Sequence, residues 1–233
     1  MDKNKVDPVL GQKVREHLKK LGYLKMEKDI PFDYEDRRAK LESLMKQVLD
    51  VCGLERENDQ LIETPKRISK YWIGESMAGL NWDWFPKCTM FDTNGMSEGS
   101  FICEKGIEVR SLCAHHFAPF FGLSGSDGQY AFGPGVTVAY IPNGKMIGIS
   151  KLARIVEFLA ARPSNQEELC GLILETLKYI LGTEDVAVFI SAYHLCQTLR
   201  GVRSSAKTIN FSCAGRFQID DKIRSEFLAI ARK

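Results

Sequence analysis

The sequence predicts an α+β protein with a helical N-terminal region at residues 1–80 and a second domain at residues 81–233. Two observations carry this prediction. Apolar residues recur at helical spacing from about residue 8 to residue 52. After Asn81 the chain changes to segments rich in β-branched and aromatic residues, interrupted by two helical stretches. The second domain is therefore expected to have the order β-β-α-α-β-β, followed by a closing helix.

The N-terminal region is predicted to contain three helices. Leu10, Val14 and Leu18 fall on one stripe of the first helix, and a second stripe runs through residues 41–48. Residues 25–34 between them are charged and include a proline, which indicates a linker. A third helix is expected to start at Thr64-Pro65, with threonine as the N-cap and proline in the first helical position. We interpret the whole region as an accessory or oligomerisation region.

Strands and helices of the second domain follow from its residue patterns. Strands are expected at residues 100–112 and 136–141, as a hairpin, and at 185–196 and 207–217. Ser150 is the predicted N-cap of a helix that ends before Pro163, and residues 166–181 form the next helix. The closing helix begins at Asp220.

Composition and charge narrow the class of protein. The chain has 233 residues, 44% of them hydrophobic, and its 32 basic and 30 acidic side chains give a net charge of +2, which is too balanced for a nucleic-acid binder. No apolar stretch resembles a signal peptide or a membrane span, so we expect a cytoplasmic protein without membrane contact. Seven scattered cysteines favour reduced thiols and metal ligation over a disulfide framework.

Two short clusters combine cysteine with histidine: Cys113-Ala114-His115-His116 and His194-Leu195-Cys196. Cys113 and His116, three residues apart, can converge in a turn while His115 points elsewhere. Strand alternation places His194 and Cys196 on one face. Cysteine and imidazole are ligands that zinc prefers, and three protein ligands with one open position are typical of a catalytic site. The alternative is that His194 and Cys196 merely complete a buried strand face.

Several basic and amide side chains have both a functional and a structural interpretation. Lys151 and Arg154 share the polar face near the start of a helix, where an anion is favoured, but they could equally form a solvated face. The same two interpretations apply to Arg200 and to the group Lys66, Arg67 and Lys70. Gln166 and Glu167 could read a purine edge, or Glu167 could serve a capping box that starts at Ser164.

Taken together, these residues resemble the GTP cyclohydrolase I family. The matching stretches occur in the family's order across roughly residues 40–233: 63–68, 113–122, 138–145, 147–156, 162–163 with 166–167, and 194–202. The resemblance implies the tunnelling fold for the catalytic domain at residues 81–233. In this fold an antiparallel sheet carries helices on one face, and subunits form a barrel that stacks into a homodecamer.

The resemblance also implies an activity, which is the zinc-dependent hydrolysis of GTP to 7,8-dihydroneopterin triphosphate and formate. Carried over by position, the metal ligands would be Cys113, His116 and Cys196, and the proton-transfer residues would be His115 and His194. Ser150 would lie near the ribose and phosphates, and Gln166 and Glu167 would read guanine. The triphosphate would be held by Lys151, Arg154 and Arg200, together with Arg67 and Lys70 of a neighbouring subunit.

Two departures from the family pattern support an alternative hypothesis. Ala114 stands where the family usually has glutamate, and residues 123–137 replace a shorter connection with what we interpret as an extended, glycine-rich hairpin. Loss of that carboxylate could loosen the metal site. The alternative is therefore a GTP-binding regulatory homologue that has lost turnover.

Overall fold

The computed structural model describes residues 3–93, 97, 100–123 and 134–232. Its helices are α1 (Pro8–Lys20), α2 (Tyr34–Val51), α3 (Thr64–Tyr71), α4 (Ile149–Ala160), α5 (Gln166–Leu181), α6 (Leu195–Thr198), α7 (Arg216–Ile219) and α8 (Asp221–Ala231). Its strands are β1 (Met90–Asp92), β2 (Ile102–Ile107), β3 (Val109–Cys113), β4 (Pro119–Gly122), β5 (Gly135–Tyr140), β6 (Lys145–Ile147), β7 (Pro163–Ser164), β8 (Val186–His194) and β9 (Thr208–Cys213). Within the described ranges, no helix is both long and apolar enough to span a bilayer.

Strand β8 is the centre of the main sheet, whose order is β2-β5-β8-β4-β3-β7 with β9 also paired to β8. Along one edge β8 pairs first with β5 and then, at Tyr193 and His194, with β4. The described pairings are antiparallel apart from that of β3 with β7. Strands β1 and β6 form a separate two-stranded sheet. The family-like mixture of helices and antiparallel strands is thus confirmed.

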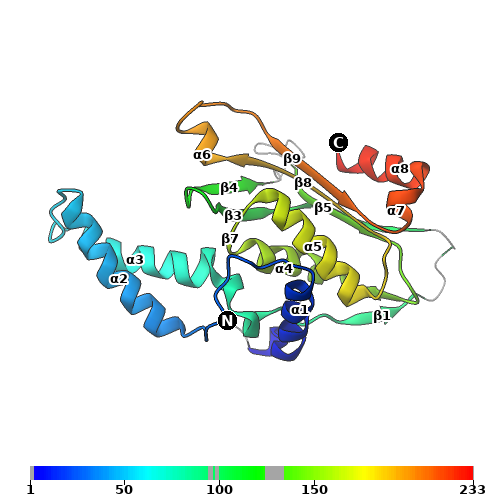
Figure 1. The fold of residues 1–233 in the computed structure, drawn as a ribbon, viewed down its shortest axis with the longest axis horizontal. Helices are drawn as coiled ribbons and strands as arrows, with labels where there is room; N and C mark the ends of the chain where they lie inside the picture. Colours follow the sequence, from blue (N-terminus) through cyan, green and yellow to red (C-terminus); the bar gives the residue numbers. More distant parts are fainter. Residues whose placement is uncertain (1–2, 94–96, 98–99, 124–133, 233) are drawn as a thin grey trace.

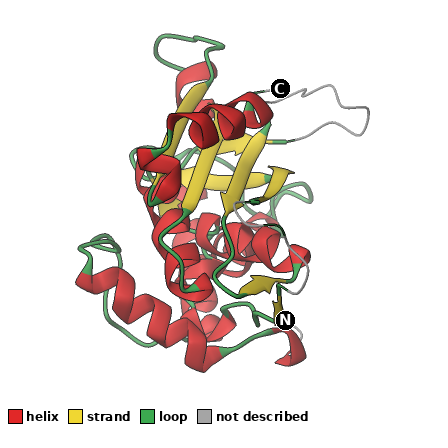
Figure 2. Cartoon of the chain, turned by 90° about the vertical axis from the view of Figure 1, so that its right-hand side faces the viewer, coloured by secondary structure: helices red, strands yellow, loops and turns green. Residues whose placement is uncertain are grey.

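Helices cover both faces of the main sheet (Figure 1). On one face, α4 and α5 bury the apolar stripes expected from the sequence, including Leu152, Ile155 and Leu169. On the other face, Phe217 and Phe227 of the C-terminal helices pack on a second cluster. The expectation of helices on one face is therefore wrong for α7 and α8 (Figure 2). Residues 186–192 of β8 are all buried, as expected for a strand covered on both sides.

The N-terminal helices differ in how they pack. Val14 and Leu18 of α1 belong to the main core, so α1 is built into the body of the domain. Helices α2 and α3 lie side by side at a distance from the sheet (Figure 1). Leu49 is the buried residue of α2. This pair therefore leaves most of its surface open.

Two predicted helix starts and one predicted capping motif need correction. Helix α3 begins at Thr64 itself, and its N-cap is Glu63. Helix α4 begins at Ile149 after Gly148, so Ser150 is a first-turn residue. The capping box at the start of α5 does not form, because Ser164 belongs to β7 and the N-cap is Asn165, which makes no side-chain capping bond.

Three predicted strands also change. The strand expected at 100–112 divides into β2 and β3 because these segments pair with different partners, and Gly106 has a φ of 76° beside the register shift. The strand expected at 185–196 ends at His194, and the one expected at 207–217 ends at Cys213. The tip of the hairpin proposed at 123–137 lies outside the described residues.

Candidate functional site

A tight turn between β3 and β4 carries the first cysteine-histidine cluster. The backbone N–H of Cys113 donates to Ala118 O (2.8 Å), and the N–H of Phe117 donates to Cys113 O (2.8 Å). Phe117 has a φ of 52°, in the left-handed region. The N–H of Ala114 donates to Ser164 O (3.1 Å), which ties the turn to β7. These contacts are made by the backbone, so the turn does not depend on a carboxylate at position 114.

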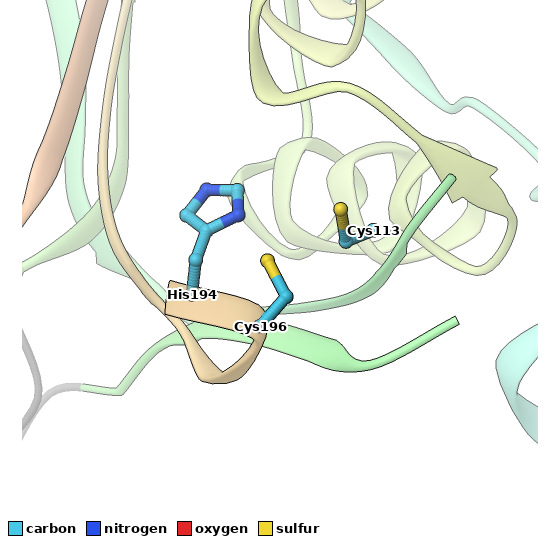
Figure 3. A group of neighbouring side chains, drawn as sticks. All are labelled: Cys113, His194 and Cys196. Carbon is cyan, nitrogen blue, oxygen red and sulfur yellow. The ribbon is translucent and has the colours of Figure 1, made fainter. Parts of the chain in front are cut away.

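Three side chains from different elements converge at this turn (Figure 3). Cys113 ends β3, His194 ends β8, and Cys196 lies in the short helix α6. Their ligand atoms all lie within 4.8 Å of one another, with Cys113 buried and the other two partly buried. Figure 3 shows both sulfur atoms and one ring nitrogen of His194 directed into a common space. These atoms could hold a metal ion.

The chemistry of the two thiols fits a divalent cation. Burial is the main factor that raises the pKa of Cys196, and the adjacent Cys113 thiol raises it further. A cation would reverse this effect, because a coordinating thiol is deprotonated by the positive charge of the metal. Two thiolates with imidazole are the soft and borderline donors found in zinc sites. The donor set therefore fits zinc.

His194 is held on two sides. Its Nε2 lies 2.9 Å from Oε1 of Gln166. Its ring stacks on Phe120, with centroids 4.6 Å apart and planes inclined by 9°. Burial lowers the pKa of His194, and the nearby Glu167 carboxylate opposes that lowering. The imidazole is therefore biased towards its neutral form, which can accept a proton or bind a metal.

The two adjacent histidines of the turn point in different directions. Nδ1 of His115 lies 3.8 Å from Sγ of Cys113, whereas Nε2 of His116 lies 2.8 Å from Nη1 of Arg200. Both histidines are exposed. These directions differ from the expectation that His116 would approach Cys113 and His115 would not. His116 instead contacts Arg200, and its role as a metal ligand stays a prediction.

The family model for GTP cyclohydrolase I matches residues 41–232. The chain belongs to the GTP cyclohydrolase I family. GTP cyclohydrolase 1 of Aeromonas hydrophila subsp. hydrophila is 40% identical over 198 residues, which cover 84% of this chain and 85% of that protein. GTP cyclohydrolase 1 of Haemophilus ducreyi is 36% identical over 224 residues, or 96% of this chain and 97% of that protein. The resemblance inferred from the sequence is thus confirmed, and the chain is an enzyme of the GTP cyclohydrolase I family.

The predicted guanine-reading pair of this family member divides into one buried and one exposed side chain. Gln166 is 1% exposed, and its Nε2 donates to Thr208 O (3.0 Å) and Ile190 O (3.4 Å). Glu167, the next residue of α5, is exposed. Of the two side chains, only that of Glu167 is open to solvent.

The predicted phosphate-binding residues lie on several elements, and only some of them lie near the group Cys113, His194 and Cys196. Cys113 pairs with Ser164, just beyond the C-terminal end of α4, whereas Ser150 and Lys151 lie in the first turn of that helix. Lys151 and the C-cap Ala161 are ten positions apart, which corresponds to about 15 Å along the helix axis. Arg200 lies at the metal end through its contact with His116. Arg67 and Lys70 are exposed on α3.

A cavity of about 790 Å³ lies between α4, the β3–β4 hairpin and the segment after α3. Arg154 and Phe158 of α4 line it, as do Arg110 and Phe120. Its size is within the range of ligand pockets. Phe120 is the link to the metal cluster, because it lines the cavity and stacks on His194. Among the described residues, the three cluster side chains do not line this cavity.

Sequence reasoning missed two residues that support the site. Phe120 was not singled out, although it is the direct strand partner of His194. Arg162 was read only as part of a matching stretch, yet its carbonyl accepts from Ser111 Oγ (2.9 Å) and so connects β3 to the end of α4. The available signal was weak: a strand-forming aromatic residue, and an arginine before proline within an apolar region.

Proposed function

We propose that this chain is a zinc-dependent enzyme that hydrolyses GTP to 7,8-dihydroneopterin triphosphate and formate, the first step of pterin and folate synthesis. The observation that carries the proposal is the convergence of Cys113, His194 and Cys196 in a chain of the GTP cyclohydrolase I family. The turn that carries Cys113 forms with alanine at position 114, because it is built from backbone hydrogen bonds.

Cys113 and Cys196 would hold the zinc ion together with one histidine. The resemblance assigns the third place to His116, and rotation of its side chain away from Arg200 would be needed to fill it. The geometry offers His194 as the other candidate. When bound, the metal would supply a Lewis acid that makes water nucleophilic near neutral pH.

The other side chains would orient the substrate and move protons. His115 and His194 lie beside the cysteines, and an imidazole can both accept and donate a proton, so both would transfer protons during ring opening and closure. Glu167 would accept hydrogen bonds from the guanine edge. The ribose and triphosphate would meet Ser150, Lys151, Arg154 and Arg200, with Arg67 and Lys70 contributed by another subunit.

We further propose that the active site is shared between subunits of a homo-oligomer, which the resemblance implies is a decamer. Two observations support sharing. Helix α4 separates Lys151, in its first turn, from the cysteine-histidine turn beyond its C-terminal end. In addition, Arg67 and Lys70 are exposed. The pair α2–α3 could supply the contacts, because Leu44, Val48 and Val51 are exposed along α2. This assigns oligomerisation to part of the region at residues 1–80.

One assay tests the activity and the metal together. Purified protein is incubated with GTP while formate and, after oxidation and dephosphorylation, fluorescent neopterin are measured; zinc is quantified on the same sample. We expect one formate for each pterin formed. Binding of GTP without formate release by a zinc-loaded, assembled sample would refute the activity and support the regulatory alternative.

Cysteine variants separate metal ligation from general thiol effects. Cys113→Ser and Cys196→Ser should each lose zinc and formate release together. Cys52→Ser is the matched control, since Cys52 is an exposed free cysteine at the end of α2, remote in sequence from both clusters. It should keep both. Zinc retained in full by both ligand variants would contradict the proposed centre.

Subunit mixing tests the shared site. Cys113→Ser and Lys151→Ala chains are each expected to be inactive as pure assemblies. When they are unfolded together and reassembled, some sites would combine an intact cysteine end from one chain with an intact lysine end from another. Recovered formate release supports sharing, whereas its complete absence from verified mixed oligomers would place both ends in one chain.

A further inference from the structure

The amide of Gln166 has its direction fixed by its surroundings. Its nitrogen lies within hydrogen-bonding distance of two backbone carbonyl oxygens, Thr208 O at 3.0 Å and Ile190 O at 3.4 Å. A carbonyl oxygen can only accept, so the NH₂ group must face these two atoms. The side chain is 1% exposed, and water cannot offer an alternative partner easily. Oε1 of Gln166 is therefore the atom that faces His194.

This direction determines which nitrogen of His194 carries the proton. Oε1 of Gln166 has no hydrogen, and it lies 2.9 Å from Nε2 of His194. A hydrogen bond between the two requires that Nε2 donates. In the neutral ring the other nitrogen, Nδ1, then holds the lone pair. Figure 3 shows a ring nitrogen directed towards Cys113 and Cys196, and with Nε2 engaged by Gln166 this nitrogen is Nδ1.

We propose that Gln166 is a positioning residue that locks His194 in the Nε2–H form and presents the Nδ1 lone pair to the space beside the two cysteine sulfurs. This inference rests on the proposed function for its catalytic meaning. It replaces the expectation that Gln166 reads guanine, because both of its amide hydrogens are directed at backbone carbonyls and its oxygen is engaged by His194. Glu167 is left as the guanine-reading member of the pair.

A second contact fixes the plane of the same ring. Phe120 and His194 are direct partners in the β4–β8 pairing, and their rings stack at 4.6 Å with a 9° inclination. Stacking prevents tilting of the imidazole, and the hydrogen bond to Gln166 prevents a ring flip that would exchange Nδ1 with Nε2. The lone pair of Nδ1 is thus fixed in position and direction, whether it takes a proton during the reaction or contacts the metal.

The test separates positioning from substrate reading. Gln166→Met keeps the approximate volume and removes the acceptor. Gln166→Glu retains an acceptor for Nε2–H but loses the donors to Thr208 O and Ile190 O, so it is read for the tautomer and not for kcat. Glu167→Gln is the matched neighbour, which should affect guanine binding. Histidine-labelled protein, metal-free and zinc-loaded, is studied by ¹⁵N solid-state NMR, in which protonated and unprotonated ring nitrogens are resolved. The His194 signals are assigned by their loss in His194→Asn.

We expect the wild type to show Nε2 protonated and Nδ1 unprotonated, and Gln166→Met to show both tautomers. Its kcat should fall roughly 10- to 100-fold, as is common when a supporting partner of a site histidine is removed. Its KM for GTP should change little. Gln166→Glu should keep Nε2 of His194 protonated, whereas Glu167→Gln should raise KM and leave the His194 tautomer unchanged.

Three results would overturn the inference: an Nδ1–H tautomer in the wild type, an unchanged His194 spectrum in Gln166→Met, or a rise in KM without a fall in kcat in that variant. The wild-type spectrum decides the question even if Gln166→Met fails to assemble. It also needs no turnover, so failure of the proposed function, seen as wild type that releases no formate, is a separate outcome.

Discussion

Replacement of Glu27 by glutamine should strongly destabilise the fold, because this carboxylate is the partner of a buried arginine. The side chains of Glu27 and Arg162 are 8% and 3% exposed, and they form an ion pair. Oε1 of Glu27 accepts from Nη1 of Arg162, while Oε2 accepts from Nε1 of Trp82 at 3.0 Å. Burial lowers the pKa of Arg162, and Glu27 opposes that lowering more than any other group. The pair therefore keeps a guanidinium charged inside the protein.

The expected magnitude follows from this geometry. Both carboxylate oxygens face donors, so glutamine must direct its NH₂ group at either the arginine or the tryptophan, whichever way the amide is turned. Arg162 would keep the carbonyls of Leu159 and Gly79 but lose its counter-charge. Removal of one partner from a buried pair typically costs about 3–5 kcal/mol. For a chain of this size that corresponds to a fall in Tm of at least roughly 6 °C.

Urea and thermal unfolding at a fixed protomer concentration measure the effect, since the stability of an oligomer depends on concentration. Lys40→Gln is the control: it removes an ion pair with Asp36 whose side chains are 73% and 50% exposed, and it should cost at most about 0.5 kcal/mol. A double variant, Glu27→Leu with Arg162→Met, should cost less than the sum of the single changes. A loss below about 1 kcal/mol in Glu27→Gln would refute the view that this buried pair supports the fold.

Three further predictions concern the ligands, the phosphates and the packing. If His116 is the third ligand, His116→Ala should reduce bound zinc, whereas His194→Ala should stop formate release and keep zinc. Zinc is measured on both variants. Loss of zinc from His194→Ala with zinc kept by His116→Ala would instead make His194 the ligand. Arg200→Ala should raise KM for GTP more than for guanosine analogues without phosphates, because a guanidinium binds phosphate oxygens; equal effects in steady-state kinetics would exclude that role. Gly79→Ala should lower the free energy of unfolding by about 3 kcal/mol, since a Cβ there would lie 2.0 Å from Phe158 O. Gly182 has open space around it but a φ of 62°, so Gly182→Ala should lower the free energy of unfolding by about 1–2 kcal/mol in the same assay.

Local patterns predicted the longer helices, and residue type singled out the three side chains that converge in the structure. The stripe of Leu152, Ile155 and Leu159 is buried as expected, because helical spacing is a property of neighbouring residues. Cys113, His194 and Cys196 were found by residue type, since few side chains bind zinc. Each of these patterns lies within a dozen consecutive residues, and tertiary packing did not change the structure that it predicts.

The errors arose where distant strands decide the structure. The alternation of side chains predicts that strand β8 continues through Cys196. In the structure β4 pairs only with Tyr193 and His194 of β8, and the chain turns into α6 after His194. Cys196 nevertheless reaches the cluster, because the helical turn brings it back beside His194. The position of His116 shows the same limit: its Nε2 contacts Arg200, which lies 84 residues away in the sequence, and no spacing rule predicts that partner.

Helix α4 lies between the proposed metal-binding residues and the proposed phosphate-binding Lys151. Its C-terminal carbonyl at Leu159 accepts from Nε of Arg162, whose own carbonyl accepts from Ser111, two residues before Cys113. Its first turn carries Lys151, about 15 Å away along the axis. If the site is shared between subunits, as proposed above, one copy of α4 would serve two sites in an assembly. The buried Arg162 would then help to set the distance between the metal of one site and the phosphates of the next.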